Sequence, residues 1–496
     1  MEATPADIDA AAHAAESAFE AYAALGPARR AAFLRRIAEE LAALGDQLLE
    51  RAQAETALTR ARLESERVRT ASQARLFADL VEEGSWVEAR VDRAQPERKP
   101  LPKPDVRRML VPLGPVAVFG VSNFPLALSV AGSDTVSALA AGCPVVVKAH
   151  PAHPGVSELA ARAILAAARA SSMPEGVFSL LHGPSPDVGQ ALVAHPRVQA
   201  VGFTGSFRAG KALLDAAARR AQPIPVFAEM GSANPVFVLP DALRARGEEI
   251  ALALAASVVL DSGQFCTNPG LTFVADPAEP FLSRLGALLA ESPAGTMAHP
   301  AIKRAYDESL TLLGALQGVK LETRSEARGP HATTEAQPAL VVTDADAFAA
   351  QQRLGEEIYG PVNVAVRCRS ESELLAAAAQ LRGHLVATVH ATERDLMAHP
   401  KLLPLLARKA GRIVLNGVPT GVEVTHAMHH GGPWPAASDP RATSIGTAAI
   451  LRFVRPVCYQ DVPDAALPEE LRDRNPRGIW RLLDGNLSRQ PLPARG

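Results

Sequence analysis

Residues 116–125, Val-Ala-Val-Phe-Gly-Val-Ser-Asn-Phe-Pro, open a region in which short apolar runs alternate with alanine-rich segments. Glycine or proline bounds each apolar run, and the segments between the runs have the length of helices. Such alternation is typical of a parallel sheet covered by helices on both faces. We therefore predict an α/β fold in which ligands bind beyond the carboxyl ends of the strands. Strands are expected at 116–119, 145–147, 198–203 and 235–239, and helices at about 126–141, 157–170 and 206–220.

The residues before this region are predicted to form helices and then an extended arm. Thr4-Pro-Ala-Asp7 is a capping signature with proline at the first helical position, and apolar residues then recur at helical spacing to about residue 44. Residues 86–91 and 106–111 alternate between apolar and polar side chains, with a proline-rich loop at 95–104 between them. Two strands joined by an exposed loop project from a domain, which indicates a contact between subunits.

The composition excludes several classes of protein. The 496 residues are 48% hydrophobic, enough for a large core, and a usual size of about 150 residues per domain predicts roughly three domains. Lys+Arg 51 against Asp+Glu 53 gives a net charge of −2, whereas nucleic-acid and membrane-surface proteins depend on a basic excess. The longest apolar run, Ile250–Leu260, has 11 residues including Ser257, short of the roughly 18 that a membrane span needs. No secretory signal and no disulfide framework are visible, so we expect a cytoplasmic protein without nucleic-acid or membrane partners.

Polar residues follow the predicted strands at the edge where ligands are expected. Asn123 comes after the first strand, where its amide can face a developing oxyanion, although a lone asparagine there is more often a turn residue. Lys148 ends the second strand, where an ammonium can bind ribose hydroxyls or phosphate, although a solvated strand end is the usual explanation. The turn Gly205-Ser206 precedes a helix and leaves backbone N–H groups free for a phosphate, a weak signal by itself.

A cysteine and a carboxylate form the remaining candidate pair. Cys266 lies between Gly263 and Gly270, and Glu229 ends an apolar run earlier in the chain. A thiol nucleophile and a carboxylate that activates water are the pair that aldehyde oxidation through a thioester requires. An inert buried thiol is the usual state of a free cysteine, and it is our expectation for the cysteines at 143, 368 and 458.

Taken together and in this order, these segments resemble the aldehyde dehydrogenase superfamily, and the resemblance covers nearly the whole chain. A further match follows them: Glu356-Glu-Ile-Tyr-Gly-Pro361 resembles a family segment that has phenylalanine in place of Tyr359. The other matching elements are Asn123 before Phe-Pro, the strand-end Lys148, Phe203-Thr-Gly-Ser206, Glu229-x-Gly231 and Gly263-Gln-x-Cys266.

The resemblance implies catalytic roles for three residues. Cys266 would attack the aldehyde, while the Asn123 amide and the backbone N–H of Cys266 would hold the oxyanion. After hydride transfer to a nicotinamide, Glu229 would deprotonate the water that hydrolyses the thioester. The substrate contacts are expected at the neighbouring positions Phe124, Phe265 and Thr267.

The same resemblance implies an NAD(P) cofactor. Lys148 and Glu357 would bind its ribose hydroxyls. NAD-preferring members commonly carry a glutamate three residues after the strand-end lysine, and here that position is Pro151. Without the carboxylate a 2′-phosphate meets no like-charge repulsion. Lys148, His150 and His153 are candidate cationic neighbours, although an imidazole is largely neutral at pH 7, and we predict NADP with NAD tolerated. The expected cofactor contacts are Lys148, His150, Gly205, Ser206, Glu357 and Tyr359.

Within the superfamily, the resemblance is greatest to the 2,5-dioxopentanoate (α-ketoglutaric semialdehyde) dehydrogenases, through segments 148–154, 227–235 and 430–460. These enzymes oxidise a short aldehyde that carries a keto acid to 2-oxoglutarate. NADP-dependent fatty aldehyde dehydrogenases share many of the segments and are the alternative. A catalytically silent relative and a coenzyme A acyltransferase are less favoured, because Cys266 and Glu229 are both present.

The resemblance also implies the architecture: a Rossmann-type cofactor-binding domain at 1–93 and 113–231, an α/β catalytic domain at 232–440, and a β-strand oligomerisation arm with a C-terminal tail at 94–112 and 441–496. The arm would pair with a strand at 450–457 and bridge the subunits of a homo-dimer or homo-tetramer.

Two further sets of residues carry competing interpretations. A carboxylate on the substrate needs a cation, and Arg441 and Arg455 are candidates by segment, although solvated or interface roles explain them as well. His426, His429 and His430 have a spacing that suits a metal. The reaction needs none and no matching ligand cluster lies nearby in sequence, so we predict no metal site.

Overall fold

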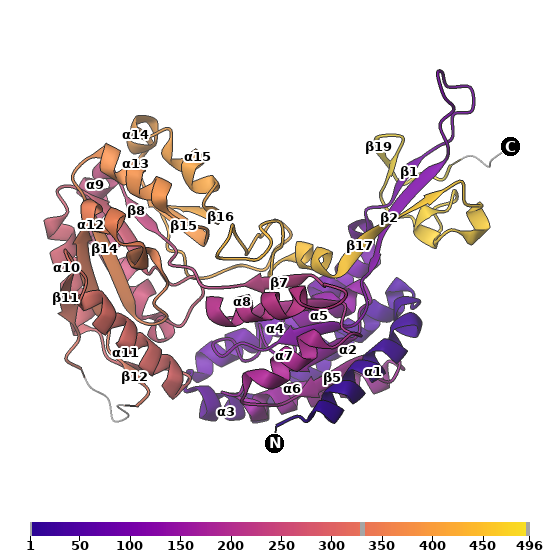
Figure 1. The fold of residues 1–496 in the computed structure, drawn as a ribbon, viewed down its shortest axis with the longest axis horizontal. Coiled ribbons are helices and arrows are strands. Elements are labelled where there is room, and N and C mark those ends of the chain that lie inside the picture. Colours follow the sequence, from indigo (N-terminus) through magenta and orange to yellow (C-terminus); the bar gives the residue numbers. More distant parts are fainter. Residues whose placement is uncertain (1, 328–332, 493–496) are drawn as a thin grey trace.

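The computed structural model describes residues 2–327 and 333–492. It contains two large β-sheets packed against helices, and a projecting arm (Figure 1). The first sheet has the strand order β5-β4-β3-β6-β7, and its neighbouring strands are all parallel. This confirms the predicted α/β class and most of the predicted strands. The strands are β3 (Val116–Phe119), β4 (Val145–Lys148), β5 (Phe178–Leu181), β6 (Ala200–Thr204) and β7 (Val226–Glu229).

Helices cover both faces of this sheet. Successive residues of a strand point to opposite faces, and in β3 all four of them are apolar and buried. Val116 and Val118 of β3 pack beneath α2, α4, α5 and α6, whereas Ala117 and Phe119 pack with α1, α7 and α8. The predicted capping box is confirmed: the Thr4 hydroxyl accepts from the Asp7 N–H at 3.3 Å, and the Asp7 carboxylate accepts from the Thr4 N–H at 2.8 Å. The helices are α1 (Pro5–Ala23), α2 (Pro27–Ala43), α3 (Gly45–Thr56), α4 (Arg60–Glu83), α5 (Ser133–Ala141), α6 (Pro154–Ala170), α7 (Pro186–Ala194) and α8 (Phe207–Ala218).

The helix expected at 126–141 begins only at Ser133, the first residue of α5. The N–H groups of Leu126 and Ala127 donate to the buried Glu66 carboxylate of α4, at 2.9 and 2.8 Å, and not to helical carbonyls. The chain after β3 therefore stays irregular where the sheet edge meets the candidate site.

The second sheet has the order β11-β13-β14-β9-β8-β15-β16 and is parallel except for the edge strand β11 among its described strands. The run expected at 235–239 supplies β8 here. The strands are β8 (Val236–Val238), β9 (Leu271–Ala275), β11 (Lys320–Arg324), β13 (Ala339–Asp344), β14 (Val362–Cys368), β15 (His384–His390) and β16 (Ala410–Leu415). The helices are α9 (Pro240–Val259), α10 (Glu279–Glu291), α11 (Pro300–Gly314), α12 (Ala345–Ala350), α13 (Glu371–Gln380), α14 (Glu393–Ala398) and α15 (Leu402–Ala407).

The arm is a third sheet, with the order β17-β2-β1-β18-β19, and it projects from the body of the molecule (Figure 1). The predicted pairing of the arm with a C-terminal strand is confirmed within one chain, since β2 and β17 are antiparallel over seven residue pairs. The tail folds back onto the arm through β18 and β19. The strands are β1 (Arg90–Asp92), β2 (Val106–Pro112), β17 (Val454–Gln460), β18 (Arg481–Leu483) and β19 (Asn486–Ser488).

Two boundaries of the predicted arm are wrong. The strand expected at 86–91 begins only at Arg90, because residues Ser85–Val87 form a 3₁₀ turn in which Trp86 and Val87 are both buried. The strand expected at 450–457 begins at Val454, because Thr447–Phe453 is a 3₁₀ segment packed against α5. The functions assigned to the three regions, with their domain limits, stay predictions.

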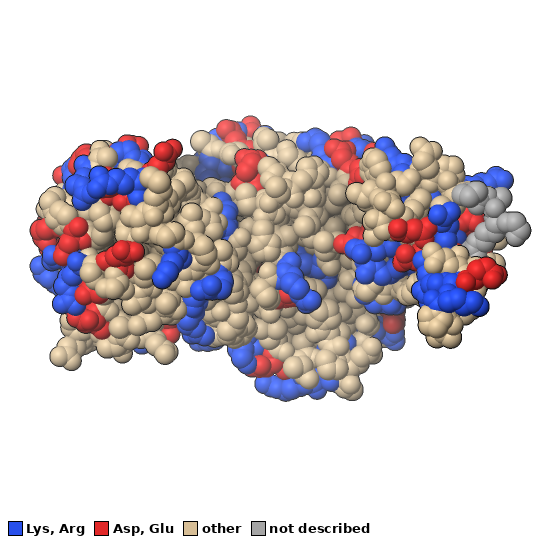
Figure 2. All heavy atoms as spheres, turned by 90° about the horizontal axis from the view of Figure 1, so that it is seen from above, with Lys and Arg blue, Asp and Glu red and all other residues tan. Residues whose placement is uncertain are grey.

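The surface carries both signs of charge. Figure 2 shows Lys and Arg interspersed with Asp and Glu on the face seen from above, as the nearly balanced net charge leads one to expect. Within residues 2–327 and 333–492, we find no helix with the length and apolar character that crossing a bilayer requires.

Candidate active site

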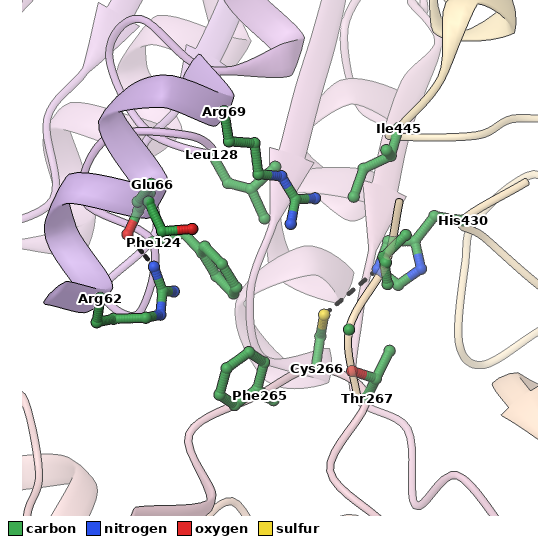
Figure 3. A pocket seen from close by; sticks show the side chains of 13 residues that line it. Arg62, Glu66, Arg69, Phe124, Leu128, Phe265, Cys266, Thr267, His430 and Ile445 are labelled. Carbon is green, nitrogen blue, oxygen red and sulfur yellow. Dashed lines mark hydrogen bonds and ion pairs between the residues drawn. The ribbon is translucent and has the colours of Figure 1, made fainter. Parts of the chain in front are cut away.

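One pocket joins elements of both parallel sheets (Figure 3). It encloses about 570 Å³ of empty space, part of it open to solvent. Its walls come from α4, from the loop after β3, from the turn before β9 and from the loop after β16. Residues from these four elements are Arg62, Arg69, Phe124, Phe265, Cys266, Thr267 and His430.

The backbone before Cys266 is held in an unusual reversal. Residues 261–263 have positive φ angles of 46°, 59° and 68°, and a Cβ atom on Gly263 would overlap the Gly360 carbonyl. Only glycine fits this close approach. The Asn234 amide then donates to the carbonyl oxygen of Cys266 at 2.8 Å. The reversal and this hydrogen bond together fix the thiol at the pocket wall.

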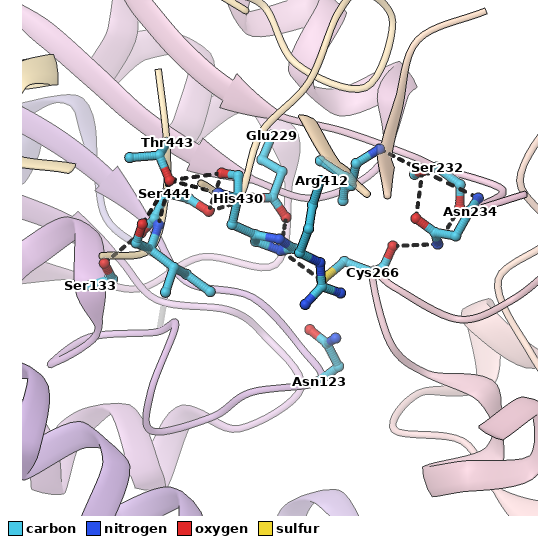
Figure 4. Close-up of polar contacts among 12 residues, drawn as sticks. Asn123, Ser133, Glu229, Ser232, Asn234, Cys266, Arg412, His430, Thr443 and Ser444 are labelled. Atoms are coloured by element: carbon cyan, nitrogen blue, oxygen red, sulfur yellow. Dashed lines mark hydrogen bonds and ion pairs between the residues drawn. The ribbon is translucent and has the colours of Figure 1, made fainter. Parts of the chain in front are cut away.

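His430 lies between the thiol and the carboxylate (Figure 4). Its Nε2 atom is 3.3 Å from Cys266 Sγ and 3.2 Å from Glu229 Oε1. The Ser444 hydroxyl donates to the other carboxylate oxygen of Glu229. Thr443 accepts from the His430 N–H at 2.8 Å, and the Ser444 N–H donates to the His430 carbonyl at 2.8 Å. The loop after β16 therefore closes on itself and presents the imidazole edge to both partners.

Burial and charge set the protonation of this group. Burial opposes ionisation of Glu229, but the adjacent His430 imidazolium and the hydrogen bonds from His430 and Ser444 outweigh it, so the pKa of the carboxyl lies below its usual value. Burial likewise opposes protonation of His430, but the Glu229 and Cys266 charges outweigh it and raise the pKa of the imidazole to about 10. At neutral pH the carboxylate is ionised and the imidazole is charged.

Sequence reasoning considered His430 only as a metal ligand. The sulfur of Cys266, a ring nitrogen of His430 and a carboxylate oxygen of Glu229 lie within 4.8 Å of one another, a donor set that a soft metal accepts. His426 and His429 do not belong to this group, and His426 instead contacts the Thr447 hydroxyl at 3.3 Å. The spacing of the histidines therefore pointed to an important residue but to the wrong partners.

Asn123 lies beside the thiol, as the sequence predicts for an oxyanion site (Figure 4). One N–H of its amide donates to the Gln264 carbonyl at 2.9 Å, which orients the side chain. Within the described part of the chain, neither the second amide N–H nor the backbone N–H of Cys266 has a hydrogen-bond acceptor. Two donors are thus available near the sulfur for a developing oxyanion.

The predicted cofactor contacts gather at the carboxyl ends of β4 and β6. Lys148 is half-buried, and burial lowers the pKa of its ammonium. Across the described residues this ammonium has no hydrogen bond or ion pair. Ser206 caps α8, where its hydroxyl accepts from the Ala209 N–H at 3.3 Å. A Cβ atom on Gly205 would come within 2.7 Å of the Phe203 ring, so the turn requires glycine.

Burial keeps the two histidines after β4 neutral, so neither is a cationic neighbour for a 2′-phosphate. Burial, and then the nearby charges of His153 and Lys148, lower the pKa of His150 to about 3, so the ring is neutral. His153 is fully buried, and its Nε2 lies 2.6 Å from the Val121 carbonyl oxygen. His153 therefore supports the loop after β3, and His150 offers a neutral ring.

Glu357 and Tyr359 approach the catalytic group from the segment after α12. The Glu357 carboxylate approaches Gly231 closely, since a Cβ atom built on that glycine would lie 2.6 Å from a carboxylate oxygen. Burial, with the Glu229 charge, raises the pKa of Glu357 to about 7, against a hydrogen bond from the Ser232 backbone. Burial also raises the pKa of Tyr359 well above its usual value.

Comparison with known proteins decides the family. Residues 1–433 match the aldehyde dehydrogenase family. The chain belongs to this family. It is 52% identical to alpha-ketoglutaric semialdehyde dehydrogenase 2 of Azospirillum brasilense, over 97% of this chain and 92% of that one. It is 46% identical to alpha-ketoglutaric semialdehyde dehydrogenase of Acinetobacter baylyi, over 98% and 92% of the two chains.

Solved structures share the aldehyde dehydrogenase fold. Aldehyde dehydrogenase 21 of Physcomitrella patens, in complex with its reaction product succinate, superposes with a TM-score of 0.77 at 21% identity, over 93% of this chain and 92% of that one. A 1-pyrroline-5-carboxylate dehydrogenase superposes with a TM-score of 0.75 at 22% identity, over 92% and 86%. The predicted fold and enzyme class are confirmed, and members of this family use NAD(P).

The residues predicted to contact the substrate of this aldehyde dehydrogenase line the pocket together. Phe124 and Phe265 pack edge to face with ring centroids 5.5 Å apart, and Thr267 is buried beside Cys266. Neither candidate arginine lines it. Arg441 is exposed and paired with Asp439 at 2.8 Å, and Arg455 is exposed on β17. The arginines that line the pocket, Arg62 and Arg69, come from α4, which carried no motif.

Proposed function

We propose that this protein oxidises α-ketoglutaric semialdehyde (2,5-dioxopentanoate) to 2-oxoglutarate with NAD(P)⁺. The observation that carries the chemistry is the contact of Cys266 with the His430–Glu229 ion pair at the wall of the pocket. The names of the relatives that are 52% and 46% identical over nearly their full length support the substrate.

In the first half of the proposed reaction, Cys266 forms a bond to the aldehyde carbon. The His430 imidazolium, 3.3 Å from the sulfur, stabilises negative charge on it and so favours attack. The second amide N–H of Asn123 and the backbone N–H of Cys266 stabilise the oxyanion of the resulting thiohemiacetal. When bound, the nicotinamide accepts the hydride whose loss converts this adduct into a thioester.

In the second half, a water molecule hydrolyses the thioester. Glu229 and His430 are both close enough to serve as its base. Because His430 holds its proton at neutral pH while Glu229 is ionised, the carboxylate is the base. The water proton moves to Glu229, the hydroxide oxygen bonds to the acyl carbon, and the C–S bond breaks to release the acid and the thiolate.

The residues at the strand ends fit the cofactor. The half-buried ammonium of Lys148 and the capped N-terminus of α8 suit ribose hydroxyls and a pyrophosphate. We expect Gly205, Ser206 and Glu357 to contribute to the same site, with His150 and Tyr359 at its margins. We propose a preference for NADP with NAD tolerated, because Pro151 puts no carboxylate beside the adenosine ribose. An NAD specificity constant tenfold or more above that for NADP would refute this preference.

The proposed function is tested by the initial rate of NAD(P)H formation with 2,5-dioxopentanoate, and Cys266→Ala protein serves as the blank. We expect a kcat/KM of about 10⁴ M⁻¹s⁻¹ or more, lost in the variant. Straight-chain aldehydes from pentanal to decanal provide the comparison. If kcat/KM rises with each added methylene and exceeds the value for 2,5-dioxopentanoate, the protein would instead be a fatty aldehyde dehydrogenase.

We also propose that the β2–β17 arm bridges the subunits of a homo-dimer or homo-tetramer in the cytoplasm. The projection of the arm from the body of the molecule supports the assembly (Figure 1). The free thiol of Cys266 supports the cytoplasmic location, because thiols stay reduced in that compartment. Light scattering on the full chain measures the mass, and a monomer at micromolar concentration would refute the assembly.

A further inference from the structure

Arg69 stands out among the charged groups of the pocket. Its guanidinium is directed into the pocket between Leu128 and Ile445 (Figure 3). Within residues 2–327 and 333–492, it makes no hydrogen bond and no ion pair, and its Nε atom is buried without a partner. The guanidinium carbon lies 5.7 Å from the centroid of the Phe124 ring.

The other charges on the pocket wall are already balanced. Arg62, two turns earlier on α4, pairs with Glu66 at 2.7 Å and with Asp261 at 2.9 Å. Glu66 also accepts from the N–H groups of Leu126 and Ala127, at 2.9 and 2.8 Å. The charge of Arg62 is therefore neutralised by two carboxylates, although its buried Nη2 atom has no hydrogen-bond partner among the described residues.

Arg412 extends from β16 toward Cys266 (Figure 4). It donates to the Pro419 carbonyl and, at 3.1 Å, to the Gly421 carbonyl, so it holds the loop that carries the far wall. Like Arg69, Arg412 has no ion pair among the described residues, but carbonyl oxygens accept from its guanidinium, whereas Arg69 has no hydrogen-bond acceptor there.

A desolvated guanidinium without a partner is costly to a protein. Burial lowers the pKa of Arg69, and the charges of Glu66, Cys266 and Glu423 oppose this shift without cancelling it. A carboxylate can accept two parallel hydrogen bonds from such a group, and these charge-assisted bonds are among the strongest in proteins. A purely apolar aldehyde would bury the cation and leave it unpaired.

We propose that Arg69 binds the carboxylate of the substrate and thereby directs the aldehyde group toward Cys266. This inference rests on the proposed function and deepens it, since it assigns the residue that selects an aldehyde acid over a neutral aldehyde. Phe124 and Phe265 would contact the carbon chain between the carboxylate and the aldehyde group. The Arg62 guanidinium carbon lies over the Phe124 ring, 4.4 Å from its centroid, and holds that ring in place.

The test compares Arg69→Gln with wild type on a charged and a neutral aldehyde of equal length, 2,5-dioxopentanoate and pentanal. We expect kcat/KM for the acid to fall about 100-fold, mostly through KM, while that for pentanal is unchanged or rises. Arg75→Gln removes the same charge from an exposed position on α4 and serves as the matched control. An equal loss of kcat/KM for both aldehydes, or no loss of kcat/KM for 2,5-dioxopentanoate, would overturn the assignment.

A second measurement separates this inference from the substrate identity. Glutarate should slow the alkylation of Cys266 by iodoacetamide in the wild type and in Arg75→Gln, but not in Arg69→Gln. Succinic and glutaric semialdehydes replace the keto acid if 2,5-dioxopentanoate is not oxidised. A wild type that prefers these acids over pentanal, with the preference lost in Arg69→Gln, supports the carboxylate site even where the proposed substrate fails. Protection by glutarate that survives in Arg69→Gln refutes it.

Discussion

Replacing His430 with glutamine should slow every reaction of the Cys266 sulfur. In the wild type the imidazolium lies 3.3 Å from the sulfur and 3.2 Å from Glu229. Its pKa is raised from 6.5 to about 10 by the Glu229 and Cys266 charges and by its hydrogen bonds to both residues, against burial. A hydrogen bond to a charged group contributes roughly 2 kcal/mol, so its loss should lower the reactivity of the sulfur about 10- to 30-fold.

The assay is the rate of iodoacetamide alkylation at pH 7, with Cys266→Ala protein to subtract the exposed Cys458. We expect a rate about 10- to 30-fold below that of the wild type, and a kcat/KM for the aldehyde reduced at least as far. His426→Gln changes a nearby exposed histidine and is the matched control. An alkylation rate in His430→Gln equal to that of the wild type would show that the imidazolium does not activate the sulfur.

Three further predictions concern Glu229, His430 and Gly263. Glu229→Gln should keep a single-turnover burst of NAD(P)H while its steady-state rate falls about 10²- to 10⁴-fold, and stopped-flow absorbance that shows no burst would contradict the role of Glu229 in hydrolysis. Because the folded-state pKa of His430 is raised, its stabilisation is complete below pH 6.5 and is lost as the pH rises to about 10. The difference in unfolding free energy between wild type and His430→Gln should shrink across that window, and a difference that grows instead would refute the assignment of charge. Gly263→Ala should lower the free energy of unfolding by at least roughly 2 kcal/mol, because its Cβ would meet the Gly360 carbonyl at a positive φ, whereas Gly314→Ala, with open space around it, should not.

Local sequence signals determined the elements of the first sheet. Apolar runs bounded by glycine or proline marked β3, β4 and β6, because a buried parallel strand must be apolar on both faces. The same signals failed at 126–132 and at 86–89, where backbone N–H groups or aromatic side chains find partners far away in sequence. A window of neighbouring residues does not contain such partners.

The sequence by itself determined the family and the fold class, and its motifs predicted Cys266, Glu229 and Asn123 as catalytic residues. Only the tertiary structure decided that His430 stands between the thiol and the carboxylate, because these residues are brought together from segments as far as 201 positions apart. It also decided that His150 is neutral and that Arg69 lacks a counter-ion, because protonation and pairing depend on burial and on charges from other elements. A motif can be recognised from neighbouring residues, whereas the burial of a side chain and its charged partners exist only once the chain has folded.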